Sequence, residues 1–379
     1  MTKTYKTANM TINKILLAGL FLLKIQAVFS QTVDLTSVDE FFKISSMLKQ
    51  GKDVSEEQWR QLEHSTGYKV FAEQNDRFLI RTVKSAMQMV FGNSREAEKK
   101  RILNLSQAEI SENKTSMLRK LLLDNYQEID RNYASLKSFR ENYNFDSLRG
   151  KAIERLSSFL GKPIDSTIVL KPVYFFFFTL DGKDEENALY IDFNLIYKMT
   201  ERQRRDFLAH EYFHNYRFFF ENHDFNHKND LNFMLDMIQN EGIADQIDKS
   251  QGYESYFSEV AVSPVSEIMI HLYHQAESDL EKIHDIVISY AKNEISEDKM
   301  IDKLLEVYKF NGHAIGFYMS SQIVKAGYGR EMLKSFYNPF EFYRLYRLAA
   351  IKNGSFQLSE EFMDYLKNRT KNHYPLEAM

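Results

Sequence analysis

The sequence contains no cysteine and only five prolines in 379 residues. The absence of cysteine excludes disulfide bonds, a thiolate metal site and a cysteine nucleophile, so any metal ligands must come from His, Asp or Glu. It also excludes a lipid-modified cysteine as a membrane anchor. Because 44% of the residues are hydrophobic and breakers are few, we predict an ordered globular protein.

The sequence also lacks a strong excess of charge of one sign. Its 49 basic and 53 acidic side chains give a formal net charge of −4, and both signs are interspersed along the chain. Nucleic-acid binding relies on clustered Lys and Arg to neutralise phosphates, so no nucleic-acid partner is expected. The surface is predicted to be an ordinary mixture of solvated charges.

A hydrophobic run long enough to cross a membrane is missing as well. The apolar run Ile15–Leu23 has nine residues, whereas a spanning helix needs about 20. Lysines precede this run, and the residues before Gln31 suit cleavage by a signal peptidase. We predict a signal peptide over residues 1–30, a secreted or periplasmic protein, and no stable membrane anchor after cleavage. An uncleaved anchor or a buried N-terminal helix is the alternative.

Patterns of apolar residues divide the remaining chain into three regions. Residues 31–160 show apolar side chains at spacings of three and four, which predict a helical N-terminal region. Residues 161–255 combine β signals with two further helices, and residues 256–379 are again predicted to be helical. Asn338 and Pro339 mark the start of one of these helices, because Asn is a favoured N-cap and Pro is favoured directly after it. The predicted fold is mainly α with a small β-sheet, in the α+β class.

The β signal consists of two short segments. Thr167–Leu180 is rich in β-branched and aromatic residues, and Ala188–Phe193 alternates as a strand does. Turn-forming residues at Asp181–Lys183 lie between them, which favours a hairpin. The edge of the second strand either binds an extended peptide or is a purely structural part of the hairpin.

A metal-binding pattern lies within Glu201–Phe220, a segment without Gly or Pro that is predicted to be one helix. His210 and His214 are four residues apart, so both imidazoles lie on one side of the helix and can bind the same ion. Glu211 is then placed to act as a general base on a metal-bound water. This five-residue pattern is only moderately specific, and a catalytic zinc needs a third protein ligand.

A second segment supplies that ligand. Glu241 and Asp245 continue an apolar helical stripe that begins at Met234, so both carboxylates are expected to be buried. Buried carboxylates need partners. Zinc would satisfy Glu241, and an imidazole N–H would satisfy Asp245. Gly242 leaves room for a close approach of two helices.

These motifs resemble the thermolysin-like zincins, in which a two-histidine helix is followed a few dozen residues later by a helix carrying Asn-Glu-x-x-x-Asp. The resemblance covers Ala188–Asp248 and implies a zincin-like fold with the zinc-binding helix pair at its centre. The roles it implies are metal ligands His210, His214 and Glu241, general base Glu211, and Asp245 as the residue that orients His210. The exopeptidase motif Gly-x-Met-x-Asn is absent, which leaves endo- or exopeptidase action open.

The C-terminal part of the chain carries a second resemblance. Gly312–Met319, with Gly327–Arg330 and Asn338–Phe340 after it, resembles a family of predicted zinc-dependent peptidases found in Bacteroidota. This resemblance covers most of the mature chain. It implies a peptidase but no known substrate.

Other polar residues have weaker assignments. His313 is a candidate donor to the oxyanion that forms when water attacks a carbonyl, and the alternative is a packed structural histidine. Tyr318 and Tyr328 are further candidates for the same task. His223 and His227 are also four apart, but they lie in an Asn- and Asp-rich segment that is predicted to be a loop, so an incidental role is expected.

The features together predict a peptidase that uses Zn2+ and acts on peptide or protein substrates. Two alternatives stay open. One is a secreted helical binding protein whose zinc site is structural or vestigial, and the other is a zinc hydrolase of non-peptide amides or esters.

Overall fold

The computed structural model describes residues 33–73, 77–106, 109, 113–179, 181–185, 187–220, 231–260 and 265–370. The predicted signal peptide at 1–30 therefore lies outside the described residues, as do His223 and His227. Among the helices that are described, none combines the length and the hydropathy needed to cross a membrane.

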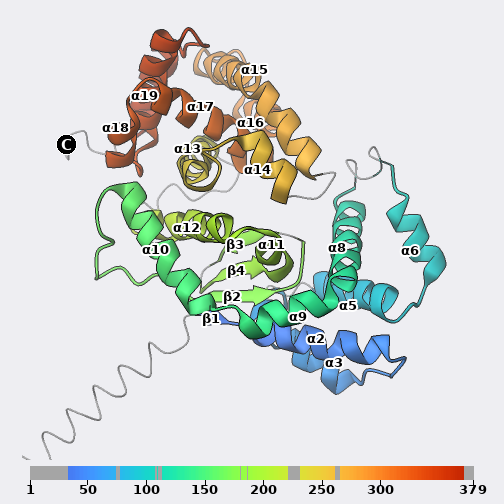
Figure 1. Ribbon diagram of the computed structural model, residues 1–379. Helices are drawn as coiled ribbons and strands as arrows, with labels where there is room; N and C mark the ends of the chain where they lie inside the picture. The colour runs from blue at the N-terminus through green and yellow to red at the C-terminus, as the bar shows by residue number, and fades with distance from the viewer. Residues whose placement is uncertain are drawn as a thin grey trace, which may run out of the picture.

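The structure is mainly helical with one small sheet, which confirms the predicted composition of the fold (Figure 1). The N-terminal region contains α2 (Thr36–Lys49), α3 (Glu56–Glu63), α4 (Thr66–Glu73), α5 (Arg77–Phe91), α6 (Glu96–Leu103), α8 (Lys114–Arg131), α9 (Tyr133–Asn142) and α10 (Phe145–Leu160). The centre contains β1 (Val33–Asp34), β2 (Val173–Phe176), β3 (Gly182–Asp184), β4 (Leu189–Asp192), α11 (Phe193–Lys198), α12 (Glu201–Phe218) and α13 (Leu231–Asp248). The C-terminal region contains α14 (Tyr253–Val260), α15 (Val265–Ala291), α16 (Glu297–Val307), the 3-10 turn η2 (Phe310–Gly312), α17 (His313–Lys325), α18 (Gly329–Lys334), α19 (Pro339–Asn353) and α20 (Glu360–Thr370).

The sheet has the strand order β1-β2-β4-β3. Strand β2 pairs in parallel with both β1 and β4, and β3 pairs antiparallel with β4. The predicted hairpin between Thr167–Leu180 and Ala188–Phe193 is therefore wrong. Gly182 and Lys183, predicted to be part of its turn, belong to the additional strand β3 instead. Strand β4 is paired on both sides, so the edges of the sheet are β1 and β3 and Ala188–Phe193 provides neither.

Strand β2 is shorter than predicted because buried side chains replace strand pairing after Phe176. The carbonyl of Phe177 accepts hydrogen bonds from the Tyr68 and Tyr126 hydroxyls at 2.7 and 3.1 Å. The backbone N–H of Phe178 donates to the carboxylate of Asp192. With their backbone groups satisfied in this way, these two residues leave the sheet while their rings stay in the core.

The sheet lies between two sets of helices. Helices α2 and α4 pack against β2, and α12 packs against β3; Figure 1 shows α2 near β1 and α12 near β3. Phe177 illustrates the core next to α2, because its ring lies 4.5 Å from that of Phe41 and 5.4 Å from that of Phe193. Helix α12 thus contacts the sheet at β3 and also packs against α13.

Helix α12 begins where the sequence predicts. The Thr200 hydroxyl accepts a hydrogen bond from the Gln203 backbone, and the Gln203 side chain accepts one from the Thr200 backbone, which forms a capping box. The helix continues without a break to Phe218. The predicted cap of α19 is also present, since the Asn338 side chain accepts from the Glu341 backbone N–H.

Helices α13 and α17 approach each other so closely that their backbones touch. A Cβ atom added to Gly242 of α13 would lie 2.4 Å from the carbonyl of Gly316 in α17. Only glycine fits at such a contact. This contact places His313, the first residue of α17, beside Glu241 of α13.

Candidate metal centre

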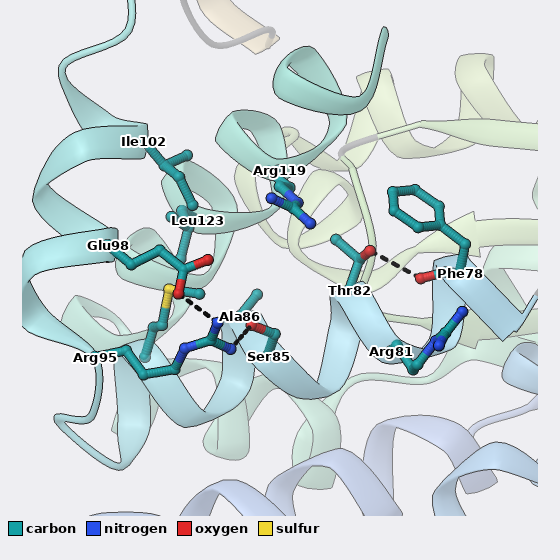
Figure 2. Close-up of a pocket in the computed structure, with 11 residues that line it drawn as sticks. Phe78, Arg81, Thr82, Ser85, Ala86, Arg95, Glu98, Ile102, Arg119 and Leu123 are labelled. Atoms are coloured by element: carbon teal, nitrogen blue, oxygen red, sulfur yellow. Dashed lines mark hydrogen bonds and ion pairs between the residues drawn. The ribbon is translucent and has the colours of Figure 1, made fainter.

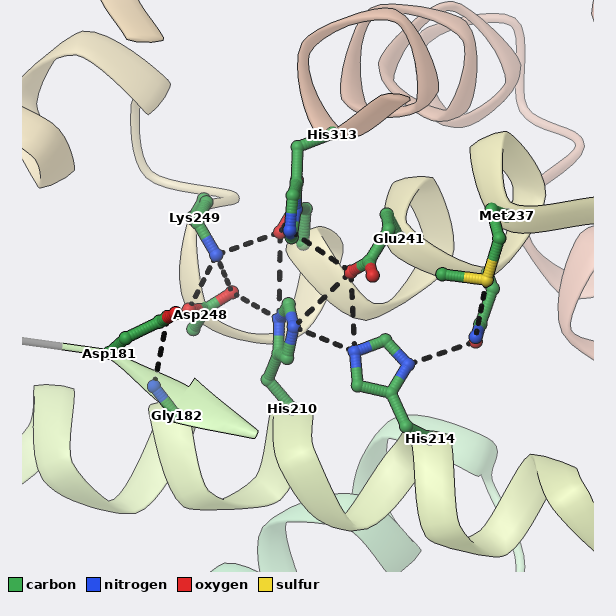
Figure 3. Close-up of polar contacts among 11 residues, drawn as sticks. Asp181, Gly182, His210, His214, Met237, Glu241, Asp248, Lys249 and His313 are labelled. Atoms are coloured by element: carbon green, nitrogen blue, oxygen red, sulfur yellow. Dashed lines mark hydrogen bonds and ion pairs between the residues drawn. The ribbon is translucent and has the colours of Figure 1, made fainter. Parts of the chain in front are cut away.

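Two imidazoles from α12 and one carboxylate from α13 meet at a single point (Figure 3). The Nε2 atoms of His210 and His214 lie 3.0 Å apart. Oε2 of Glu241 lies 3.3 Å from Nε2 of His214 and 3.7 Å from Nε2 of His210. The structure therefore brings together the three residues that the sequence predicts to be metal ligands.

The other nitrogen of each imidazole is held by an acceptor. Nδ1 of His210 lies 3.1 Å from Oδ1 of Asp248, and Nδ1 of His214 lies 3.0 Å from Oδ1 of Asn240. Because both partners offer acceptor oxygens, we assign the proton of each neutral ring to Nδ1. Each Nε2 then directs a lone pair toward the common point, as a metal ligand does.

The centre has polar atoms that the protein alone does not satisfy. Oε2 of Glu241 is buried and has no hydrogen-bond partner among the described residues. The Nε2 atoms of His210 and His214 also lie 3.0 Å apart, so a proton or a metal ion must lie between them. An ion bound by Zn–N bonds of about 2.0–2.1 Å and a Zn–O bond of about 2.0–2.2 Å would satisfy all three atoms. The donor set of two His and one Glu therefore fits zinc.

The charges at the centre also favour a cation. Burial disfavours a charged His214, but the Glu241 carboxylate outweighs this and raises the pKa of His214 to about 10. Burial opposes ionisation of Glu241 too, yet His313 and His214 lower its pKa to about 2. Burial lowers the pKa of His210, which keeps that ring neutral near pH 7 despite the nearby Asp248. A site that holds an extra proton this firmly stabilises positive charge.

The carboxylate predicted to orient His210 has a different set of neighbours. Oδ1 of Asp245 lies 3.5 Å from Nδ1 of His210, farther than Asp248. Its shorter contacts are with Nζ of Lys249 at 2.7 Å and Nδ1 of His313 at 3.1 Å. Asp248 is thus the nearer partner of His210, and Asp245 holds His313.

Asp248 and Asn240 are site residues for which the sequence predicted no role. Asn240 lies in the Asn-Glu-x-x-x-Asp motif, one residue before Glu241. Asp248 lies seven residues after Glu241, two helical turns along the same side of α13. This spacing is the signal that identifies Asp248.

Glu211 lies in the cleft beside the three predicted ligands and against the edge strand. Its carboxylate touches β3, because a Cβ atom on Gly182 would lie 2.8 Å from Oε1 of Glu211. Burial raises the pKa of Glu211 to about 8, and His214 opposes this shift only in part. Within the described part of the chain the carboxylate has no hydrogen-bond partner, so it is available to a water or a substrate.

A cleft of about 550 Å³ opens over the centre. One wall is the edge strand with its acidic residues, and the opposite wall is apolar and comes from α14 and α15. Its lining includes Asp181, Asp184 and Glu185 on the strand side and Tyr256, Phe257, Val260 and Met269 on the apolar side. The cleft is within the range of ligand-binding sites, about 300–1,000 Å³.

His313 lines this cleft, whereas the two candidate tyrosines do not. Nε2 of His313 lies 3.3 Å from Oε2 of Glu241, and its Nδ1 contacts Asp245. Burial acts against protonation, but the carboxylates of Glu241 and Asp245 raise the pKa of His313 to about 9. Tyr318 packs near Tyr346, and Tyr328 lies under Lys352.

Comparisons with known proteins give one match. A family model described as "Putative zinc dependent peptidase (DUF5700)" matches residues 59–355. Neither the curated proteins nor the solved structures yield a match. The matched range contains the two-histidine helix, Glu241 and His313, and the family description names zinc as the metal.

Proposed function

Because the chain belongs to this family of zinc-dependent peptidases, we propose that it hydrolyses peptide bonds at the centre formed by His210, His214 and Glu241. The observation that carries the proposal is the buried Oε2 of Glu241, which has no hydrogen-bond partner among the described residues and lies 3.3–3.7 Å from the Nε2 atoms of His210 and His214. We assign the protein to the thermolysin-like zincins with Glu as third ligand, which have a zinc-binding helix pair at the centre of the fold. The resemblance to members from Bacteroidota stays a prediction.

Glu211 is the proposed general base. Zinc bound at the centre would lower the pKa of a coordinated water and polarise the substrate carbonyl. Glu211 takes the proton from the attacking water and passes it to the leaving amine. A base works best when its pKa lies near the working pH, and burial moves the pKa of Glu211 in that direction.

His313 is the proposed stabiliser of the oxyanion. Its Nδ1–H donates to Asp245, which fixes the ring and leaves Nε2 directed into the cleft. When protonated, Nε2 can donate to the oxygen on which negative charge develops. His313 is thus a catalytic residue, and Asp245 is a positioning residue that acts through it.

The substrate is proposed to be a peptide or protein segment that lies along β3. This strand is one edge of the sheet and lines the cleft through Gly182, Lys183 and Asp184. An extended peptide can add to such an edge through backbone hydrogen bonds. The apolar wall around Phe257 and Val260 would then receive a large apolar side chain of the substrate.

Export is part of the same proposal. The N-terminal lysines, the short apolar run and the residues before Gln31 support a signal peptide over residues 1–30 and a secreted or periplasmic enzyme. N-terminal sequencing of the protein recovered from the periplasm or medium of an expressing cell would detect cleavage after Ser30. An intact N-terminus in the cytoplasm would contradict export.

Glu211→Gln tests the proposed chemistry. The variant keeps the size of the side chain but cannot accept the proton, so we expect zinc to remain bound and peptide hydrolysis to fall by a factor of about 10² or more. The assay is digestion of a peptide library, with and without a chelator, together with elemental analysis. Glu306→Gln, on the exposed side of α16, is the matched control. Full activity of Glu211→Gln would exclude this residue as the base.

The same experiments separate the two alternatives. Bound zinc without any peptide cleavage would favour a hydrolase of non-peptide amides or esters. A fourth protein ligand that closes the coordination shell would favour a structural or vestigial zinc in a binding protein. Neither outcome fits a peptidase.

A further inference from the structure

A second cavity, of about 390 Å³, lies between α5, α6 and α8 (Figure 2). It is separate from the catalytic cleft, because the two are lined by different faces of α8. Met117 and Leu121 of this helix line the cleft, whereas Arg119 and Leu123 line the second cavity. Nothing in the proposed peptidase mechanism uses this space.

The cavity combines an apolar floor with a basic rim. Ala86, Met89, Ile102 and Leu123 form the floor and are each no more than 3% exposed. Three guanidinium groups but only one carboxylate, that of Glu98, are among the lining residues. An amphiphilic lining of this kind suits a ligand that has an apolar body and an anionic head.

Arg119 is the arginine that is available to a ligand. Figure 2 shows its side chain reaching from α8 into the space between the helices. Among the described residues it has no hydrogen-bond or ion-pair partner, although it is half-buried. A planar guanidinium binds a carboxylate through two parallel hydrogen bonds, so it can anchor an organic acid.

The backbone around Arg95 holds a second guanidinium at the same rim. Arg95 has φ +58°, a left-handed conformation that non-glycine residues rarely adopt. Its side chain donates to Ser85 at 2.8 Å and pairs with Glu98. These contacts hold the guanidinium between the start of α6 and α5 at the mouth of the cavity, where Glu98 offsets its charge.

We infer that this cavity is a binding site for a small organic carboxylate with an apolar tail. Arg119 binds the carboxylate at the rim, and the tail lies on the floor formed by Met89 and Leu123. The site is independent of the proposed peptidase function, because none of its lining residues belongs to the cleft.

The test uses the full mature chain and 11-(dansylamino)undecanoate, whose fluorescence increases in an apolar site. We expect saturable binding that decanoate displaces. Arg119→Glu should weaken binding by at least about tenfold, because it replaces a charge-assisted hydrogen bond with repulsion. Arg131→Glu makes the same charge change at the exposed end of α8 and should bind as the unaltered protein does.

Competition defines the head group. Decanol lacks the charge and inorganic phosphate lacks the tail, so neither should displace the probe at the concentration at which decanoate does. Displacement by decanol as effective as by decanoate would overturn the assignment of an anionic ligand. Absence of saturable binding, or equal binding by Arg119→Glu and the unaltered protein, would overturn the site itself. If Arg119→Glu binds the probe with unchanged affinity, the probe binds at another surface, such as the apolar wall of the cleft.

Discussion

Nε2 of His210 and Nε2 of His214 face each other at 3.0 Å, while Nδ1 of each ring is held by an acceptor. Two nitrogen lone pairs at this distance repel each other unless a proton or a metal ion lies between them. The buried Glu241 carboxylate next to them adds negative charge at the same point. The arrangement thus requires a cation, which is a proton shared through His214 in the metal-free protein and a metal ion when one is bound.

Zinc removal should therefore lower the melting temperature. A ligand that binds only the folded state, present at 100 times its Kd, stabilises that state by about 2.7 kcal/mol. Differential scanning fluorimetry with and without a chelator measures the shift, which zinc should reverse and magnesium should not. The variant His214→Gln has lost a ligand, so its melting temperature should respond weakly to the chelator. An unchanged melting temperature of the unaltered protein after demonstrated metal loss would contradict this coupling.

Asp248→Asn should weaken zinc binding without abolishing it. The carboxylate of Asp248 accepts from Nδ1 of His210 and so makes that ring a better ligand. Loss of such a partner costs about 10- to 100-fold in metal affinity. Competition with a zinc-binding dye measures the Kd, and Asp302→Asn on the exposed face of α16 is the control. Equal zinc affinity of Asp248→Asn and the control would show that Asp248 does not support the ligand.

The parts of the site that the sequence predicts are those set by local helix geometry. His210, Glu211 and His214 lie within one unbroken helix, so their relative positions follow from 3.6 residues per turn. The start of α19 is local too, since Asn338 and Pro339 are adjacent. No long-range information is needed for either prediction.

The parts that the sequence missed depend on contacts between distant segments. Whether Asp245 or Asp248 is closer to His210 depends on how α13 is rotated against α12, and the Gly242–Gly316 contact with α17 constrains that rotation. The parallel pairing of β2 with β4 and with the two-residue β1 joins segments far apart in the chain. Side-chain alternation does not distinguish parallel from antiparallel partners at such short lengths.

His313→Ala should lower kcat while zinc stays bound. Removal of one oxyanion donor typically costs about 10²–10³-fold in kcat. Asp245→Asn should lower kcat less, because the ring remains but its orientation is weakened. Kinetics with a fluorogenic peptide, together with zinc analysis, measure both effects, and His271→Ala on the exposed side of α15 is the control. A normal kcat for His313→Ala would leave His313 with a packing role only.

Gly242→Ala should destabilise the protein through the contact between α13 and α17. The new Cβ atom would lie 2.4 Å from the backbone of Gly316, and backbone atoms cannot move aside as a flexible side chain can. Overpacking of this kind costs about 1–3 kcal/mol. It should also move His313 away from Glu241, so activity should fall even at temperatures where the variant is folded.

Gly150→Ala provides a control with the opposite expected sign. Gly150 lies within α10, and a Cβ atom there meets no other atom within 4 Å. Alanine at a helical position without steric conflict stabilises by about 0.5–1 kcal/mol, because glycine loses more backbone entropy on folding. Urea unfolding of the zinc-bound proteins, followed by circular dichroism, should therefore give a lower midpoint for Gly242→Ala and a slightly higher one for Gly150→Ala. Equal midpoints for the two variants would mean that α13 and α17 can separate at little cost, and the position of His313 would then not depend on their contact.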